Sequence, residues 1–312
     1  MQTEVLTVDP TSPESAPIDR AAEVLRRGGL VAFPTETVYG LGANALDASA
    51  VRRIFEAKGR PANNPVIVHV AEVEQARQLV AEWPAAAERL AGQFWPGPLT
   101  LVLPRRDIIP DMVTAGRATV AVRMPAHPIA LALIRAAGVP VAAPSANRST
   151  QLSPTLAEHV LHGLQGRIDL VLDGGPTSGG LESTVLDLTS SPRVLRPGLV
   201  SIPELDAILG PVLRPDVVLD VGESPPSPGM LPRHYAPRTP LECAENGARR
   251  AKELHDAGLR VGRLALPGSW LERSSAATVV MPADASAYAA SLYATLHALD
   301  ALGLDWIVVD LP

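Results

Sequence analysis

Residues 30–42 read LVAFPTETVYGLG, and residues 47–61 read DASAVRRIFEAKGRP. The first stretch opens with four apolar residues, 30–33, which predict a short buried strand that ends at Pro34. The second stretch opens with Asp47, a suitable helix N-cap, and then carries apolar residues at helical spacing. A strand, a loop and a helix in this order predict an α/β fold.

The same alternation of strands and helices continues on both sides of this unit. Further strands are expected at 66–70, 99–103, 119–124, 139–143, 170–173 and 184–188, and further helices at 18–27 and 127–137. Several of these strands lie close enough in sequence to pair antiparallel, so we expect a twisted mixed sheet with function on its loops. Residues 17–210 should form this domain, and the polar residues 1–16 should form a partly ordered N-terminal arm.

The chain has 312 residues, which exceeds the usual size of a single hydrophobic core and predicts two domains. Eight prolines lie between residues 211 and 240, so this segment is expected to be an extended linker. Residues 241–312 should form a small three-layer α/β domain. Its expected helices are 245–257 and 284–302, and its expected strands are 259–266, 278–281 and 306–309.

The composition is that of an ordered globular protein, with 46% hydrophobic and 19% charged residues. The first 25 residues carry no signal-peptide pattern, and no apolar run reaches the roughly 18 residues of a membrane span. One cysteine, Cys243, excludes internal disulfides and cysteine-rich zinc sites. We therefore expect a cytoplasmic protein without a membrane association. The net charge of −6 argues against stable nucleic-acid binding but allows a local basic cleft.

Only two of the 27 Lys and Arg residues are lysines, and one of them, Lys58, is followed by Gly59, Arg60 and Pro61. Pro61 disfavours a helical conformation for Arg60, and Gly59 allows close approach of the backbone to a ligand. In extended chain, Lys58 and Arg60 would point the same way and could bind one polyanion together. The alternative is a pair of solvated surface residues.

Polar side chains follow two of the expected strands. Thr35 and Thr37 come after the first, and Ser145 and Asn147, again two residues apart, come after the strand at 139–143. Strand ends of this kind bind small polar ligands in α/β folds. Turn formation and helix capping are the alternatives. A dinucleotide fingerprint at residues 40–45 is disfavoured, because six residues separate it from the strand end.

Three further features could bind anions. The glycine-rich stretch 173–180 could cradle phosphate with its backbone amides, or could simply form turns. Arg123 and Arg196 end expected strands and could pair bidentately with a carboxylate or phosphate. His69 alternates with valines, so it should face away from an apolar side, where a structural role is the alternative.

Several familiar catalytic signatures are missing. There is no glycine-lysine P-loop, no Gly-x-Ser-x-Gly elbow, no His-Glu-x-x-His and no cluster of metal-ligating residues. Any nucleotide chemistry must therefore use a site of another kind, and no metal site made of protein side chains is predicted.

Six motifs, taken in order, carry a family resemblance. They are Pro-Thr-Glu-Thr-Val-Tyr-Gly-Leu-Gly from 34, Lys-Gly-Arg-Pro-x-x-Asn-Pro from 58, Val-Arg-Met-Pro from 122, Pro-Ser-Ala-Asn from 144, Ser-Thr-Val from 183 and Leu-Arg-Pro-Gly from 195. Over residues 18 to about 205 the chain resembles the YrdC-like family. Residues 227–237 and the second domain are similar to the two-domain threonylcarbamoyl-AMP synthases of that family.

The resemblance implies a nucleotidyltransferase reaction. L-threonine, bicarbonate and ATP, with Mg²⁺, give L-threonylcarbamoyl-AMP and pyrophosphate. A separate tRNA threonylcarbamoyl transferase then uses the product to form N6-threonylcarbamoyladenosine at position 37 of tRNA. The mechanism needs no protein nucleophile, because positioning and electrostatics suffice, chiefly from Lys58 and Arg60.

The resemblance also implies the site residues. The ATP set is Lys58, Arg60, Asn64, Thr119, Ser145, Asn147, Ser153 and Arg196, with His234 and Tyr235 of the linker as a lid over the site. The threonine set is Thr37, His69, Arg123 and Ser183. The linker departs from the family pattern at residues 231–233, where Leu-Pro-Arg replaces the usual Lys-Tyr.

Two other functions compete with this one. A related class adenylates carbamoyl phosphate in hydrogenase maturation, but it carries cysteine-rich zinc modules that one cysteine rules out. An RNA-binding module with a YrdC-like fold and no adenylating activity is the second, and the aromatic content of 4% counts against it.

Overall fold

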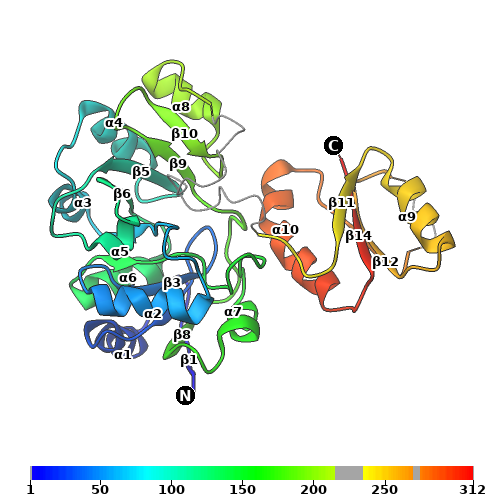
Figure 1. Ribbon diagram of the computed structural model, residues 1–312, viewed down its shortest axis with the longest axis horizontal. Helices are drawn as coiled ribbons and strands as arrows, with labels where there is room; N and C mark the ends of the chain where they lie inside the picture. Colours follow the sequence, from blue (N-terminus) through cyan, green and yellow to red (C-terminus); the bar gives the residue numbers. More distant parts are fainter. Residues whose placement is uncertain (1, 215–234, 270–274, 312) are drawn as a thin grey trace. The chain divides into compact units, whose positions relative to one another are not determined.

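The computed structural model describes residues 2–214, 235–269 and 275–311. The chain forms two units, shown in Figure 1. The first comprises residues 1–149 and 153–234, and the second comprises residues 150–152 and 235–312. No described helix is long and apolar enough to cross a membrane.

The first unit is built on a ten-stranded sheet in the order β1-β8-β2-β3-β7-β4-β6-β5-β9-β10. The strands are β1 Glu4–Thr7, β2 Val31–Phe33, β3 Gly40–Asn44, β4 Val68–His69, β5 Leu99–Pro104, β6 Thr119–Arg123, β7 Val141–Ala142, β8 Leu170–Asp173, β9 Thr184–Asp187 and β10 Arg193–Arg196. The sheet contains both parallel and antiparallel pairs; β6, for example, is parallel to β4 and antiparallel to β5. The expected mixed sheet is confirmed.

Helices cover both faces of this sheet. They are α1 Ser15–Arg26, α2 Ala48–Lys58, α3 Val73–Leu79, α4 Ala85–Phe94, α5 Asp111–Thr114, α6 Pro128–Ala137, α7 Ala157–Leu164 and α8 Ile202–Leu209. Apolar residues of α1 and α6 form one core with strand residues such as Val31 and Leu170. The other six helices contribute to the larger core on the opposite face. The N-cap expected for α2 is confirmed, because the Asp47 carboxylate accepts from Ser49 N and Ala50 N.

The face covered by α1 and α6 continues across β4, β6, β5, β9 and β10. It carries a separate apolar cluster whose members all lie in strands or directly before one: Ile67, Val102, Ala121, Val185 and Leu195. Side chains two residues apart on a strand share a face, so Thr119 and Arg123 of β6 point to the same side as Ala121. We call these five apolar residues the strand-face cluster.

The expectation of an N-terminal arm at residues 1–16 is wrong. Glu4–Thr7 forms the edge strand β1, which pairs in parallel with β8, and α1 already begins at Ser15. The alternating exposure of β1 is that of an edge strand, and its partner lies more than 160 residues away in the chain. Nothing local could reveal that pairing.

The second unit has four parallel strands in the order β11-β14-β12-β13. They are β11 Leu241–Ala244, β12 Val261–Ala265, β13 Ala277–Val280 and β14 Trp306–Asp310, with helices α9 Gly247–Asp256 and α10 Ala285–Asp300. Leu254 of α9 packs against Val261 on one face of the sheet. Leu299 of α10 lies over the backbone of Gly262 on the other face. The two helices flank the sheet in Figure 1. Strand β11 was not predicted from the sequence.

Most of the expected linker lies outside the described residues, because the structure describes only 211–214 and 235–240 of it. Residues 235–240 belong to the second unit.

Candidate active site

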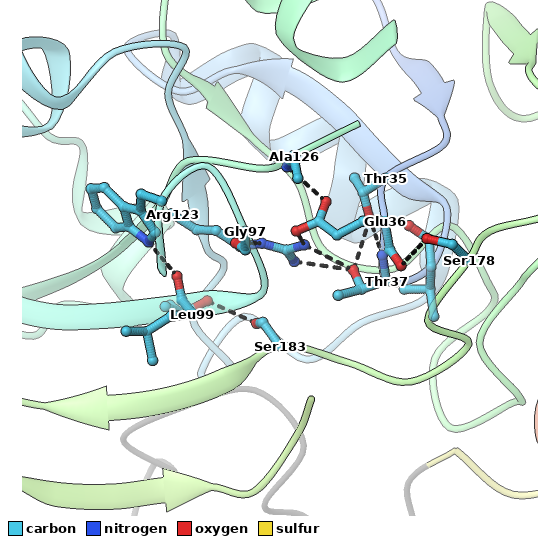
Figure 2. A network of polar contacts seen from close by, with 12 residues as sticks. Thr35, Glu36, Thr37, Gly97, Leu99, Arg123, Ala126, Ser178 and Ser183 are labelled. Carbon is cyan, nitrogen blue, oxygen red and sulfur yellow. Dashed lines mark hydrogen bonds and ion pairs between the residues drawn. The ribbon is translucent and has the colours of Figure 1, made fainter. Parts of the chain in front are cut away.

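A buried guanidinium lies at the end of β6. Figure 2 shows the Arg123 side chain reaching the loop that follows β2. Its Nε donates to Gly97 O at 3.3 Å, its Nη1 and Nη2 each donate to Thr37 Oγ1 at 3.1 Å, and its Nη2 also donates to Glu36 Oε1 at 2.5 Å. Arginine has five N–H donors, so these four bonds leave one N–H of Nη1 for a ligand.

The loop that holds Arg123 is itself fixed by hydrogen bonds. The Thr35 and Thr37 hydroxyl oxygens lie 2.7 Å apart, and Thr35 Oγ1 also donates to Val38 O. The second carboxylate oxygen of Glu36 accepts from Ala126 N at 3.0 Å. Thr37 therefore binds Arg123. The hydroxyl groups of Thr35 and Thr37, which were expected to face a substrate, make most of their hydrogen bonds within the protein.

His69 lies beside Arg123, because β4 and β6 pair these two residues. The side chain is buried, and its ring packs edge-on against Phe33 at 6.5 Å between centroids. Burial, and then the positive charge of Arg123, lower the pKa of His69 to about 3. His69 is therefore neutral near pH 7, and its Nδ1 has no hydrogen-bond partner among the described residues.

Acid should unfold the protein partly through His69. Its pKa is about 3 in the fold and near 6.5 in an unfolded chain, so His69 costs no stability above pH 6.5 and destabilises progressively as pH falls toward 3. At pH 5 the cost is about 2 kcal/mol. We expect His69→Gln to lose less stability than the parent between pH 7.5 and pH 5 in urea unfolding. His255→Gln, at an exposed position on α9, is the control, and equal losses in all three proteins would contradict the prediction.

Lys58, a second buried basic residue, is the last residue of α2. Lys58 Nζ donates to Ser145 O and Asn147 O, both at 2.5 Å, and to Asn147 Oδ1 at 3.3 Å. These contacts tie α2 to residues 144–149, the segment that follows β7. Burial, then the charges of Arg60 and Arg148, hold the pKa of Lys58 well below its usual value.

Arg60 is fixed in a similar way. Its Nε donates to Asn64 O at 3.1 Å, and its Nη2 donates to Asn64 Oδ1 at 2.5 Å and to Pro65 O at 2.8 Å. The prediction that Lys58 and Arg60 share an extended segment is wrong. Lys58 is the last helical residue of α2, and Gly59 ends the helix in the left-handed conformation at φ 62°. That conformation favours glycine, which explains Gly59 at this position.

Thr119 lies at the same end of the sheet as Ser145. Strand β4 is parallel to β6 and antiparallel to β7, so β6 and β7 run in opposite directions. The start of β6 therefore lies at the same end of the sheet as the end of β7, where the chain continues into residues 144–149. Thr119 starts β6 there, while Arg123 ends β6 on the same face. A strand rises about 3.3 Å per residue, which separates the two Cα atoms by about 13 Å.

A third group of polar residues lies near the start of β9. Arg196 Nε and Nη2 donate to Ser183 O at 3.1 and 2.9 Å, and Nη2 also donates to Ser183 Oγ at 3.1 Å. Ser183 Oγ lies 2.8 Å from Thr100 Oγ1. Ser153 Oγ donates to Glu182 Oε1 at 2.5 Å. Hydrogen bonds thus connect the predicted residues Ser153 and Ser183, which lie in loops, and Arg196, which ends β10.

The structure also accounts for two glycine-containing segments of the sequence. The amides of the glycine-rich stretch hold neighbouring loops, since Gly179 N donates to Glu36 O at 2.8 Å and Gly180 N donates to Thr37 O at 3.1 Å. The disfavoured dinucleotide fingerprint is excluded because Gly42 lies inside β3. A Cβ at Gly42 would lie 2.8 Å from the rings and methyls packed against it, so close packing accounts for that glycine.

Of the two predicted lid residues, His234 and Tyr235, the structure describes only Tyr235. His234 lies outside the described residues, and Tyr235 belongs to the second unit, where its ring lies 6.2 Å from that of Tyr293. Their role over the nucleotide stays a prediction.

Sequence reasoning missed three residues that the fold brings to this site. Glu36 binds Arg123, Thr100 contacts Ser183, and Arg148 adds its charge near Lys58. Glu36 stood inside a quoted motif and Arg148 directly follows one, so the signal for them was their position and not their chemistry.

The described residues do not fit a protein-made metal site. Within them, no group of three His, Cys, Asp or Glu residues could hold a metal ion. The two carboxylates of the site are engaged elsewhere, Glu36 with Arg123 and Glu182 with Ser153.

Comparisons with known proteins identify the family of the chain. A model of the Sua5, YciO and YrdC proteins, described as telomere recombination, matches residues 23–198. A second model, described as the C-terminal domain of threonylcarbamoyl-AMP synthase, matches residues 200–312. The threonylcarbamoyl-AMP synthase of Bacillus subtilis is 45% identical over 97% of this chain and 90% of its own length. That of Pyrococcus abyssi is 47% identical over 93% of this chain and 87% of its own.

Solved structures of the same family have a similar fold. The crystal structure of Pyrococcus abyssi Sua5 complexed with L-threonine matches with a TM-score of 0.92 and 44% identity, covering 99% of this chain and 92% of that one. Escherichia coli YciO covers 65% of this chain, with a TM-score of 0.59 and 26% identity. The first unit is therefore a YrdC-type domain. With its second domain, the chain belongs to the Sua5-type, two-domain threonylcarbamoyl-AMP synthases, the enzymes of threonylcarbamoyladenosine formation in tRNA.

Proposed function

We propose that this enzyme binds the phosphates of ATP at the end of β6 where Thr119 lies and L-threonine at the end where Arg123 lies. The observation that carries the proposal is the position of both residues on one face of one strand. The apolar strand-face cluster lies between them and beside them. Two substrates that must react with each other would thus share one surface, about 13 Å from end to end.

The positive charge at the first end supports phosphate binding. Lys58, Arg60 and Arg148 lie close enough together for the charges of the two arginines to act on the lysine. Asn64, Ser145 and Asn147 border these cations, and their amide and hydroxyl groups suit nucleotide oxygens. Arg196, at the end of β10, and Ser153 complete the proposed ATP site.

At the second end, the remaining N–H of Arg123 suits the carboxylate of an amino acid. His69, neutral and buried, lies beside it, and Thr37 accepts hydrogen bonds from it. We place Ser183 with these three residues. We assign these four residues to threonine.

The reaction then follows from proximity. The threonine ammonium group first loses a proton. The free amine then attacks carbon dioxide, with loss of one further proton, or bicarbonate, with loss of water, and gives a carbamate. A carbamate oxygen attacks the α-phosphorus of ATP, and the bond to pyrophosphate breaks. The chain supplies orientation and positive charge for the leaving group, so no covalent enzyme intermediate is needed. A lid formed by His234 and Tyr235 would protect the labile carbamate from water.

Mg²⁺, when bound with ATP, would neutralise phosphate charge, and its ligands would be chiefly phosphate oxygens and water. The product would pass to a separate tRNA threonylcarbamoyl transferase. Stable nucleic-acid binding by this chain is not expected at a net charge of −6.

Pyrophosphate release tests the proposal. Purified protein with ATP, Mg²⁺, bicarbonate and L-threonine should release pyrophosphate, and omission of either threonine or bicarbonate should lower the rate at least tenfold. Pyrophosphate release at the same rate with and without threonine would contradict the proposal, and so would salt-sensitive tRNA binding without any ATP turnover.

A further inference from the structure

Glu36 has no part in the reaction described above, yet its carboxylate lies inside the proposed threonine site. The Glu36 side chain is 13% exposed, and the Arg123 side chain that it contacts is 4% exposed. Figure 2 shows its two oxygens turned in different directions, one to Arg123 Nη2 and one to Ala126 N. The pair has no net charge, and it offers a cation and an anion side by side.

A free α-amino acid carries the complementary arrangement. Its carboxylate and its ammonium group are attached to the same Cα, so their nearest N and O atoms lie within about 3 Å of each other. The Glu36 and Arg123 groups are 2.5 Å apart at their contact. One zwitterion could therefore place its carboxylate on the guanidinium and its ammonium on the carboxylate.

The hydrogen-bonding capacity of both groups allows this. Arg123 retains one N–H on Nη1, because four of its five donors are used. A carboxylate offers about four lone-pair positions, and the structure shows Glu36 using two of them. The loop around Glu36 is held at both ends, since Gly179 N donates to its carbonyl and Thr37 holds Arg123.

We propose that Glu36 is a positioning and specificity residue that binds the α-ammonium group of L-threonine and so selects zwitterionic amino acids over plain carboxylic acids. This inference rests on the proposed placement of threonine at Arg123. Without Glu36, Arg123 would attract any carboxylate. With it, a carboxylate that lacks an ammonium group meets a negative charge beside its cation and is repelled.

A role confined to folding is the other explanation, because Glu36 also neutralises a buried arginine and accepts a backbone N–H before α6. Such a role would make Arg123 and its loop less ordered when Glu36 is changed. Every ligand of Arg123 would then bind less well by a similar factor. The two roles therefore differ in what happens to the ratio of affinities, and not in whether threonine binding weakens.

The test is a cycle of two proteins and two ligands, measured by isothermal titration calorimetry. The ligands are L-threonine and (R)-3-hydroxybutyrate, which is threonine with hydrogen in place of the ammonium group. The parent enzyme should prefer threonine at least 100-fold. Glu36→Gln, which keeps the size and an acceptor oxygen, should reduce this preference below tenfold. An unchanged ratio in Glu36→Gln would overturn the inference, whereas a parent enzyme that binds no threonine would overturn the proposed function itself.

Glu36→Asp is the second variant, because it keeps the charge and changes the packing. It should retain a preference for threonine well above that of Glu36→Gln. If both variants lost the preference for threonine over (R)-3-hydroxybutyrate equally, the effect would come from packing and the inference would be overturned. If Glu36→Gln does not fold, loss of this preference in Glu36→Asp alone would overturn the inference in the same way.

Discussion

Replacing Lys58 with methionine is expected to lower threonine-dependent pyrophosphate release at least 100-fold. Methionine fills a similar volume but cannot donate to Ser145 O and Asn147 O, so one buried and one partly buried carbonyl oxygen lose their donor. Each unpaired group costs about 1–3 kcal/mol, and a loss of about 3 kcal/mol in loop positioning already corresponds to a 100-fold change in rate. The segment 144–149 would move, and with it the proposed nucleotide contacts of Ser145 and Asn147.

Lys252→Met is the matched control, since the chain contains only one other lysine. Lys252 lies on the exposed surface of α9 in the second unit and pairs with Asp256 at 2.6 Å. Its loss should leave pyrophosphate release within twofold of the parent. A folded Lys58→Met enzyme with activity near that of Lys252→Met would refute the assignment of Lys58.

Arg123→Lys should raise the KM for threonine at least 100-fold and change the KM for ATP by less than fivefold. Lysine keeps the charge but has no planar fork, so it cannot contact Gly97, Thr37 and Glu36 together and still present a donor to the substrate. The ATP groups lie at the other end of β6, which separates the two effects. Steady-state kinetics with each substrate varied in turn would measure them.

Arg263→Lys provides the control for this variant. Arg263 forms an equally buried ion pair with Asp310 at 2.7 Å, but in the second unit. Its replacement should lower the thermal midpoint and leave the KM for threonine unchanged. If both variants raised that KM alike, the effect of Arg123→Lys would reflect general destabilisation and not substrate binding.

The sequence anticipated the elements whose signals are local. The buried run at residues 30–33, the Asp47 cap of α2 and the strand that ends at Arg123 were all visible in short stretches. Each depends on apolar periodicity or on a hydrogen bond between near neighbours, which a sequence displays directly. The same is true of the motif order that indicated the YrdC-like family.

The contacts within the site were not visible in this way. Glu36 meets Arg123 across 87 positions of the chain, and Lys58 meets Asn147 across 89. A sequence shows that charges exist but not which acceptors surround them, so Lys58 was expected in extended chain and is found at a helix end. The partners of the glycine-rich amides were hidden for the same reason.

By itself, the sequence determined the α/β class, the two-domain organisation, most of the described strands and half of the described helices, and it supplied most of the residues that we propose for the site. Only the tertiary structure decided that residues 4–7 form a strand, that Lys58 ends a helix and binds the carbonyl oxygens of Ser145 and Asn147, and that Glu36 neutralises the buried guanidinium. The physical reason is that local propensity acts over a few residues, whereas the pairing of sheet edges and buried charges depends on segments far apart in the chain that meet only when the core forms.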